Sequence, residues 1–366
     1  MSDEISAAVI EEFNKPLKIR NFKRPKLSEG EVLVRISAAG VCGSDVHIWR
    51  GLDPRVSTPI IPGHEGVGVI DEIAGEKRDV FGRSLSAGDM IIWDRGVTCG
   101  RCEYCTIYKM PSLCPNRWTY GISKSCNEPP YLNGCYSEAI VLDRNTRIIK
   151  LEETVDPVTL VPASCSGATS AHSFELRPPR IGESVLILGP GPLGIFHVAF
   201  SREYGASEII VIGGTKERLE MCRRFGATHI INRRETTIEE RIKMIRELTD
   251  GRGVDVAYEC SGTNQAFMEG LQHIRIGGSF VVPGFGVPKG RAEIDCFHQI
   301  TRKNIEIRGV WVSDTEHLYR AVRLVQSGKY PFRELITHIK PLEEATEALR
   351  LVEERRTIKA VITPSN

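Results

Sequence analysis

The chain has 366 residues, of which 41% are hydrophobic and 26% charged, which fits a globular protein large enough for two domains. Its 48 basic and 47 acidic residues leave a net charge of +1, so charge attracts neither nucleic acid nor an anionic membrane, and neither is an expected partner. No apolar run reaches the roughly 20 residues that cross a bilayer. The acidic N-terminal stretch lacks the hydrophobic region of a secretory signal peptide, so we expect a cytoplasmic location.

The first third of the chain is expected to form a mostly β domain. Three β-branched runs bounded by glycine predict strands over 31–42, 66–74 and 88–93. The loops between these runs are rich in glycine, proline and cysteine. The pattern therefore predicts short strands joined by irregular loops.

From Glu183 onward, short apolar runs alternate with amphipathic stretches. We expect strands at 184–189, 209–213, 229–232, 254–260 and 278–284, with helices at 192–204, 216–226, 238–248 and 264–273. Such alternation predicts a parallel sheet with helices on both faces. A strand over 305–312, an amphipathic helix around 318–325 and a helix–strand pair ending at 359–364 follow.

These elements predict an α/β chain with two domains. A mostly β domain is expected over 1–165 and a doubly wound parallel sheet over 166–309. The C-terminal part, 310–366, is expected to complete the first domain.

A glycine motif follows the first expected strand of the second domain and opens its first helix. Gly189, Gly191 and Gly194 form GxGxxG, with Pro192 and Leu193 between them. In this context the glycines permit a tight turn and let a pyrophosphate approach the positive end of the helix. The motif predicts a dinucleotide-binding Rossmann fold, and the alternative is a glycine turn without a ligand.

The end of the second strand bears on the choice between NAD and NADP. A carboxylate there binds the ribose 2′-hydroxyl of NAD, but this chain has Gly213, followed by Gly214, Thr215 and Lys216. Lys216 or Arg218 could pair with the 2′-phosphate of NADP, so the segment favours NADP. The alternative is that these cations are solvated at a helix start and that NAD binds.

A cluster of cysteines predicts a structural zinc site. Its members are Cys99, Cys102, Cys105 and Cys114. Four thiolates at this spacing fit a closed tetrahedral zinc, which leaves no open position for chemistry. A disulfide framework is the alternative, although nothing else in the sequence indicates secretion. Cys126 and Cys135 lie beyond the cluster and have no assigned role.

Three further candidate metal ligands are separated along the sequence. Cys42 lies in AGVCGSDVH, His64 in PGHEGVG and Cys165 in VPASCSGAT. A catalytic zinc needs three protein ligands and one open position. Taken singly, each residue is better explained without a metal: Cys42 and Cys165 as buried small side chains, and His64 as a hydrogen-bonded core histidine.

Together, these motifs resemble zinc-dependent medium-chain alcohol dehydrogenases over nearly the whole chain. CGSDVH and GHEGVG are especially similar to sorbitol and threonine dehydrogenases, and the four cysteines, GPGPLG and KNIEIRGV follow in the family's order. The resemblance implies a GroES-like catalytic domain, a Rossmann cofactor domain, a catalytic and a structural zinc, NAD or NADP, and a homo-oligomer, either dimer or tetramer. It also implies hydride transfer between the cofactor and a small alcohol or carbonyl compound, with a secondary alcohol or polyol expected.

The resemblance assigns roles at the metal position by position. Cys42, His64 and Cys165 match the three catalytic zinc ligands. Glu65 matches a residue that can approach or ligate the metal. Asp45 matches the carboxylate that orients the ligand histidine.

It also assigns a proton relay and a cofactor lining. Ser44 matches the hydroxyl that takes the substrate proton, and His47 matches the outer end of the relay. The positions that match the cofactor lining are Leu193, Gly213, Arg218, Pro283, Gly284, Phe285, Val310 and Trp311.

Three departures from the family pattern keep alternatives open. Polyol-oxidising relatives usually carry glutamate where this chain has Cys165, so a simple alcohol or aldehyde reductase is the alternative function. The gap from Cys105 to Cys114 is one residue longer than usual, and Gly213 replaces the usual acidic residue. A non-catalytic dinucleotide-binding protein is a further alternative, but no ligand or relay residue has been lost.

Overall fold

The computed structural model describes residues 3–364, which fold into two compact units. The first unit holds the chain up to Cys165 together with Ser313–Ser327 and the part from Phe332 onward, and the second holds Ser166–Val312 with Gly328–Pro331. None of the helices in the described chain is long and apolar enough to cross a membrane. The roles assigned to the predicted domains stay a prediction.

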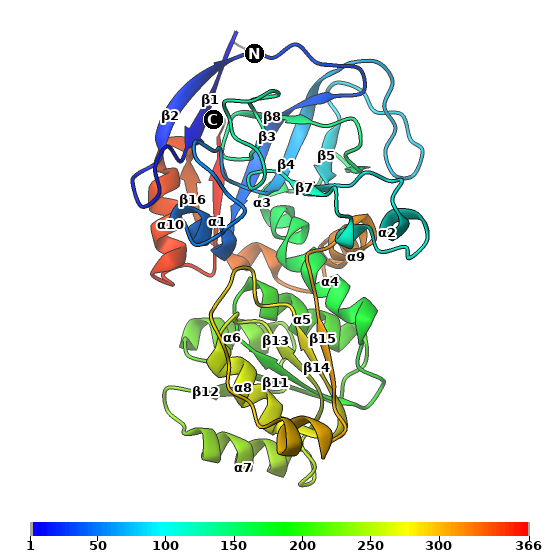
Figure 1. The fold of residues 1–366 in the computed structure, drawn as a ribbon, viewed down its shortest axis with the longest axis vertical. Coiled ribbons are helices and arrows are strands. Elements are labelled where there is room, and N and C mark those ends of the chain that lie inside the picture. Colours follow the sequence, from blue (N-terminus) through cyan, green and yellow to red (C-terminus); the bar gives the residue numbers. More distant parts are fainter. Residues whose placement is uncertain (1–2, 365–366) are drawn as a thin grey trace. The chain divides into compact units, whose positions relative to one another are not determined.

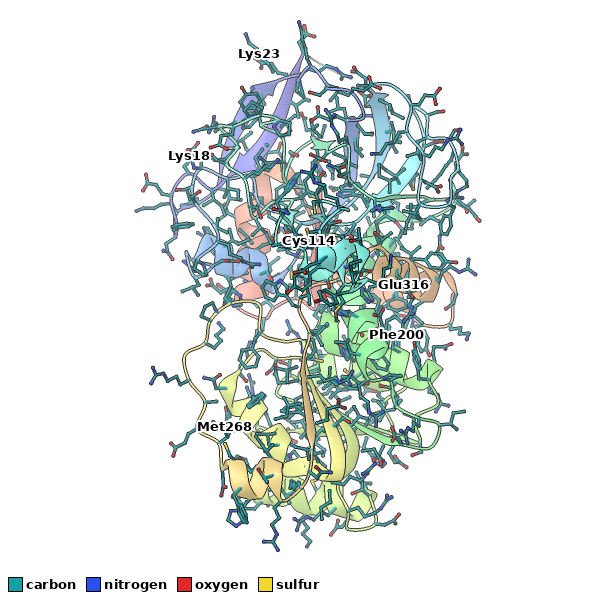
Figure 2. All side chains as sticks on the ribbon, turned by 45° about the vertical axis from the view of Figure 1, so that its right-hand side comes forward. Lys18, Lys23, Cys114, Phe200, Met268 and Glu316 are labelled. Atoms are coloured by element: carbon teal, nitrogen blue, oxygen red, sulfur yellow. The ribbon has the colours of Figure 1, made fainter. Side chains whose placement is uncertain are left out.

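Most strands of the first unit join one seven-stranded sheet (Figure 1). In spatial order the strands are β16 (Ile336–Pro341), β17 (Lys359–Thr363), β3 (Val32–Val41), β4 (Glu65–Ile73), β5 (Met90–Trp93) and β9 (Ile148–Lys150), with β8 (Ala139–Leu142) also paired to β3. Two strand pairs lie outside it: β1 (Glu4–Val9) with β2 (Lys18–Lys23), and β6 (Gly96–Val97) with β7 (Trp118–Thr119). Lys18 and Lys23 mark the two ends of β2 in Figure 2.

Short helices connect these strands. They are α1 (Gly43–Trp49), α2 (Glu103–Thr106), α3 (Pro157–Leu160), α9 (Thr315–Gln326) and α10 (Ala345–Glu353), with the short turns η1 (Pro111–Leu113), η2 (Val161–Ser164), η4 (Phe332–Leu335) and η5 (Leu342–Glu344). The C-terminal strand β17 pairs with β3, so chain ends far apart in sequence share one sheet. In this sheet β17 and β4 flank β3, and Gly40 of β3 pairs with Val361 on one side and with Glu65 on the other.

The second unit is built on a six-stranded, all-parallel sheet. Its strands, in spatial order, are β12 (His229–Asn232), β11 (Glu208–Gly213), β10 (Ser184–Leu188), β13 (Val254–Glu259), β14 (Ile274–Val282) and β15 (Glu306–Gly309). The helices are α4 (Ser166–Leu176), α5 (Pro192–Glu203), α6 (Lys216–Arg224), α7 (Ile238–Leu248) and α8 (Asn264–His273), with the π-helical turn η3 (Cys296–Thr301). The strand order reverses between β10 and β13, which marks the position where a dinucleotide binds in such a sheet.

Local sequence explains why these elements form where they do. Every residue of β10 is buried, as expected for an apolar strand covered on both faces. Gly191 precedes α5 and Pro192 occupies its first turn, where a missing N–H costs nothing. Thr237 and Glu240 cap α7 reciprocally. The predicted α/β class, with a mostly β unit and a doubly wound parallel sheet, is confirmed.

The structure departs from the predicted elements in several places. β14 begins four residues before the predicted strand because the chain extends directly from the end of α8. β15 is shorter than predicted and α9 begins earlier, since Asp314 caps it by accepting from the Glu316 N–H at 3.1 Å. The β1–β2 pair was not predicted, because the sequence KIRNFK of β2 is largely charged and exposed.

Candidate active site

Cys42 lies at the junction between β3 and α1. The strand ends at Val41, and Cys42 is the residue that precedes the helix. The Asp45 carboxylate accepts the Cys42 N–H at 2.8 Å, which fixes the first turn of α1. Asp45 is fully buried, so its second oxygen must also find a donor.

That donor is His64, at the start of β4. His64 Nδ1 lies 3.1 Å from Asp45 Oδ1, and its Nε2 lies 3.4 Å from Cys165 Sγ. Cys165, which follows η2, places its sulfur 4.0 Å from that of Cys42. Three separated segments therefore bring two sulfurs and one imidazole nitrogen together in the first unit.

Electrostatics at these sulfurs favour a thiolate. The pKa of Cys42 lies well below its usual value, chiefly because Cys165 hydrogen-bonds to its sulfur, and the same hydrogen bond raises the pKa of Cys165 well above the usual range. Burial lowers the pKa of His64, but Asp45 and Cys42 outweigh burial and raise it to about 10. Thiolate is the metal-binding form of cysteine.

This donor set fits zinc. Cysteine sulfur and histidine nitrogen are the ligands that Zn²⁺ prefers, and a carboxylate on the second ring nitrogen is the usual way to orient such a histidine. Cys42, His64, Glu65 and Cys165 each offer a ligand atom within 4.8 Å of the others. Three strong ligands with an open fourth position are typical of a catalytic zinc.

Glu65 has a partner that the sequence did not reveal. Its carboxylate lies 2.6 and 2.7 Å from Lys359 Nζ of β17, and both side chains are fully buried. Burial raises the pKa of Glu65 to about 7, although Lys359 opposes the rise. Gly40 lies opposite Glu65 in the sheet, and a Cβ there would come within 2.1 Å of Glu65 Oε2. Glycine at position 40 thus leaves room for this carboxylate.

Two other neighbours of the site were also missed. The Arg95 guanidinium hydrogen-bonds to Cys165 Sγ, and the Tyr136 hydroxyl donates to Asp45 Oδ2 at 3.2 Å. Both side chains are buried. Neither residue lies in a recognisable motif, so only the packing of the unit places them here.

The predicted relay residues lie on one side of α1. Ser44 Oγ is 3.8 Å from Cys42 Sγ, and His47 follows three residues later. Residues three apart on a helix are neighbours on its surface. Both side chains are half-buried, with Ser44 beside the sulfurs and His47 one turn further along.

The four-cysteine lobe forms around α2 and η1, where Figure 2 labels Cys114. Sulfur–sulfur separations are 3.5 Å for Cys102–Cys105, 3.7 Å for Cys102–Cys114 and 3.5 Å for Cys114–Cys99. Four sulfurs about 2.3 Å from a tetrahedral zinc lie about 3.8 Å apart. The set fits zinc despite the longer gap, and all eleven cysteines are free thiols, so the disulfide alternative is wrong.

Two of the three glycines of the motif in the second unit, Gly189 and Gly194, leave no room for a side chain. Gly189 has φ +111°, and a Cβ there would lie 2.9 Å from the Ser261 backbone nitrogen. A Cβ on Gly194 would lie 2.0 Å from the Gly189 carbonyl oxygen. A Cβ on Gly191 would meet nothing within 4 Å, so this side of the turn is open to a ligand. This is the arrangement expected beneath a pyrophosphate.

The other predicted cofactor residues follow the carboxyl ends of neighbouring strands. Gly213 ends β11, Pro283–Phe285 follow β14, and Val310 and Trp311 follow β15. Leu193 lies in the first turn of α5. In a parallel sheet these ends share one edge, so the fold brings the predicted lining together.

The structure adds two arginines at the end of β11. Asn232 pairs with Gly213, and Arg233 and Arg234 come directly after it. A Cβ on Gly214 would lie 3.1 Å from Arg233 Nε and 3.3 Å from Arg234 Nε. Both side chains are exposed, and no carboxylate in the described chain forms an ion pair with either. Lys216, a candidate for the 2′-phosphate from the sequence, is exposed at the start of α6.

Comparison with known proteins identifies the family. Residues 28–153 match the family model for the alcohol dehydrogenase GroES-like domain, and residues 192–327 match the model for zinc-binding dehydrogenases. A 5-exo-hydroxycamphor dehydrogenase of Pseudomonas putida is 32% identical over 91% of both chains. An L-threonine 3-dehydrogenase of Paraburkholderia phymatum is 31% identical over 85% of this chain and 86% of its own.

A solved structure agrees with these matches. The crystal structure of an alcohol dehydrogenase from Thermotoga maritima is 45% identical, covers 99% of this chain and 100% of its own, and superposes with a TM-score of 0.95. This chain belongs to the zinc-dependent medium-chain alcohol dehydrogenase family. The predicted family, with threonine dehydrogenase-like relatives, is confirmed.

Membership defines the class of chemistry. This medium-chain dehydrogenase is a zinc-dependent oxidoreductase that transfers a hydride between a nicotinamide cofactor and an alcohol or carbonyl compound. The zinc-type donor sets and the open glycine turn agree with that class. Fold alone would not assign the chemistry, but the site residues and the fold agree.

Proposed function

We propose that the enzyme oxidises a secondary alcohol, with Cys42, His64 and Cys165 holding a catalytic zinc. The convergence of two sulfurs and an Asp45-oriented imidazole in one buried site carries this proposal. A zinc held there supplies Lewis-acid chemistry, which lowers the pKa of a bound alcohol. Glu65 stays beside the ligands through its pairing with Lys359.

Ser44 and His47 then carry the proton to solvent. Ser44 Oγ receives it next to the sulfurs, and His47 passes it on from the half-buried end of the same helix face. Histidine suits this role because its unperturbed pKa of about 6.5 lets it exchange protons near neutrality. We expect His47→Ala to lower kcat roughly tenfold near pH 7.

The His47→Ala variant must keep its metal for this result to count. Zinc content, measured by mass spectrometry, serves as the control. A variant with wild-type kcat across the pH range would remove His47 from the relay.

We further propose that NADP is the preferred cofactor. A cofactor bound at the glycine turn would supply the nicotinamide that takes up hydride. Arg233 and Arg234 lie over Gly214, at the strand end where NAD-binding relatives of this fold usually carry an acidic residue. Two unpaired guanidinium groups there match a 2′-phosphate, which accepts paired hydrogen bonds from arginine.

Replacing these arginines tests the preference. The double variant Arg233→Gln/Arg234→Gln should raise KM for NADP roughly 10- to 100-fold and leave KM for NAD within about twofold. Lys216→Gln, a nearby exposed cation, is the matched control. Equal use of NAD and NADP by the wild type would contradict the proposal.

The substrate class rests on the relatives and on the ligand set. Both curated relatives carry the name of a secondary alcohol. Cys165 in the third ligand position favours the alternative, a simple alcohol or aldehyde reductase. Initial rates on matched secondary and primary alcohols, before and after zinc removal, discriminate the two.

The same assay tests the proposal as a whole. A zinc-dependent rate with secondary alcohols, and loss of zinc in Cys165→Ser, are the expected results. A rate that survives removal of the catalytic metal would overturn the role of the three ligands.

Two further properties belong to this proposal. We expect a homo-oligomer, because β15 is an edge strand whose four residues are all exposed. Two large apolar side chains on either side of β15 in the sequence, Phe297 and Trp311, are exposed as well. We expect a cytoplasmic enzyme, because eleven free thiols, six of them in two metal-type sets, suit a reducing compartment.

A further inference from the structure

Two arginines lie together next to the proposed catalytic ligands. Arg95 follows β5, is 7% exposed, and is held in place by its hydrogen bond to Cys165 Sγ. Arg117 precedes β7, which pairs with β6 directly after Arg95. A Cβ on Gly96 would come within 2.0 to 2.3 Å of the Arg117 guanidinium atoms. The Arg117 guanidinium therefore lies flat over Gly96, the residue after Arg95.

Arg117 keeps one edge without a partner. Its Nη1 donates to Thr119 Oγ1 at 2.7 Å, but Nε and Nη2 are buried and have no hydrogen-bond partner in the described chain. No described carboxylate lies within ion-pair distance of this side chain. Burial is the main cause that lowers the pKa of Arg117 to about 10; Asp94 opposes this shift and the nearby Arg95 adds to it.

Asp94, a buried carboxylate close to Arg117, already has other partners. Asp94 accepts the Gly96 N–H at 3.0 Å and the Thr315 hydroxyl at 3.4 Å. A buried guanidinium with unpaired N–H groups is costly, because its charge and its donors have both lost water. The Nε and Nη2 atoms form the edge of arginine that binds a carboxylate or phosphate with two parallel hydrogen bonds.

We propose that the substrate alcohol carries an anionic group, a carboxylate or a phosphate, which the Nε–Nη2 edge of Arg117 binds. This inference rests on the proposed function and narrows its substrate class. The substrate hydroxyl would lie at Cys42, His64 and Cys165. Arg95 connects that position to Arg117, because it hydrogen-bonds to Cys165 and directly precedes Gly96, against which Arg117 packs. The two guanidinium groups then neutralise the anionic end of the substrate.

Matched substrate pairs test this proposal. The zinc-loaded enzyme is assayed with 2-butanol against 3-hydroxybutyrate, and with glycerol against glycerol 1-phosphate. We expect kcat/KM to be roughly tenfold or more higher for one of the two anionic members than for its neutral partner. Comparing the two substrate pairs shows whether the enzyme prefers a carboxylate or a phosphate.

Variants of Arg117 separate binding from a structural role. Arg117→Gln should lower kcat/KM for the preferred anionic substrate roughly 10- to 100-fold, mainly through KM, and leave its neutral partner within about twofold. Arg117→Lys, which keeps the charge, should recover part of the loss. Arg55→Gln is the control, because this neighbouring cation is already paired with Asp53 at 2.6 Å.

A second readout does not depend on turnover. Isothermal titration calorimetry with 3-hydroxybutyrate and with glycerol 1-phosphate should detect binding of one of them to the zinc-loaded wild type and its loss in Arg117→Gln. Binding unchanged by Arg117→Gln, binding of neither anion, or higher kcat/KM for both neutral alcohols would overturn this inference. If zinc-loaded protein with bound dinucleotide oxidised no alcohol of either kind, the proposed function itself would fail.

Discussion

Single residues show how this enzyme buries charge beside its proposed metal ligands. Lys359 and Glu65 are fully buried and meet through 2.6 and 2.7 Å contacts, although they are 294 positions apart in sequence. Removing one partner of such a pair leaves an uncompensated charge in the interior. The pairing therefore ties β17, the last strand of the chain, to Glu65 at the start of β4.

We expect Lys359→Met to destabilise the zinc-loaded protein by about 3–5 kcal/mol. The measurement is the free energy of unfolding in urea. Adding Glu65→Gln to the variant should restore much of the loss, because the orphaned charge is gone. A single variant within about 1 kcal/mol of the wild type would show that Glu65 finds another partner.

The residues of the candidate site differ in how far the sequence could predict them. Cys42, His64 and Cys165 stood out through short motifs and their resemblance to a family. Lys359 and Arg95 lie in no motif, and their contacts depend on strand pairing and loop packing. A long-range contact leaves no local pattern in a single sequence.

At the scale of elements, α7 and α8 are joined by a buried polar cluster; Figure 2 labels Met268 on α8. Arg241 pairs with Glu269 at 2.7 and 2.9 Å, and His273 Nε2 lies 3.3 Å from the same carboxylate. Burial raises the pKa of Glu269, but the hydrogen bonds from His273 and Arg241 outweigh burial and lower it to about 2.

This shift predicts a dependence of stability on acid. A carboxyl with a lowered pKa stabilises the fold above its unfolded value of about 4.3, and this contribution is lost as pH falls toward 2. We expect the wild type to lose roughly 2–3 kcal/mol of unfolding free energy from this group across that window. The Glu269→Gln variant should be less stable than the wild type at pH 7, and it should not show this acid-dependent loss of unfolding free energy.

Urea unfolding of the two proteins at pH 7 and near pH 3 measures the difference. Glu220→Gln on α6, an exposed carboxylate, is the control and should follow the wild type. If the wild type and Glu269→Gln lost the same unfolding free energy between pH 7 and pH 3, the assigned role of Glu269 would be contradicted.

Elements were predicted best where the pattern is local. The helices α5 to α8 were predicted from amphipathic stretches, and their strands from short apolar runs. β1 and β2 were not predicted, because the charges of β2 hide its pairing. η3 was not predicted either, since a π-helical turn has no distinctive residue pattern here.

The whole molecule raises the question of assembly. β15 ends the parallel sheet, with all its residues exposed and Ile307 38% exposed. An unpaired edge can pair with the same edge of a second copy about a twofold axis. We expect Ile307→Asp to shift the enzyme toward a smaller assembly, because it places like charges side by side across that axis.

Sedimentation velocity at micromolar concentration measures this change. Ile181→Asp is the control, because Ile181 is 91% exposed in the same unit but lies away from β15. An unchanged mass for Ile307→Asp, or a monomeric wild type, would exclude assembly through this edge.

The sequence by itself determined the local features of the enzyme. The alternation of strands and helices, GxGxxG after an apolar strand and four closely spaced cysteines each depend on neighbouring residues, so they can be read without coordinates. The tertiary structure alone decided the rest. It brought Cys42 to within 4.0 Å of Cys165 across 123 positions, set Lys359 against Glu65, and placed Arg233 and Arg234 over Gly214. These contacts depend on strand order and register, which arise from packing the whole chain rather than from any single segment.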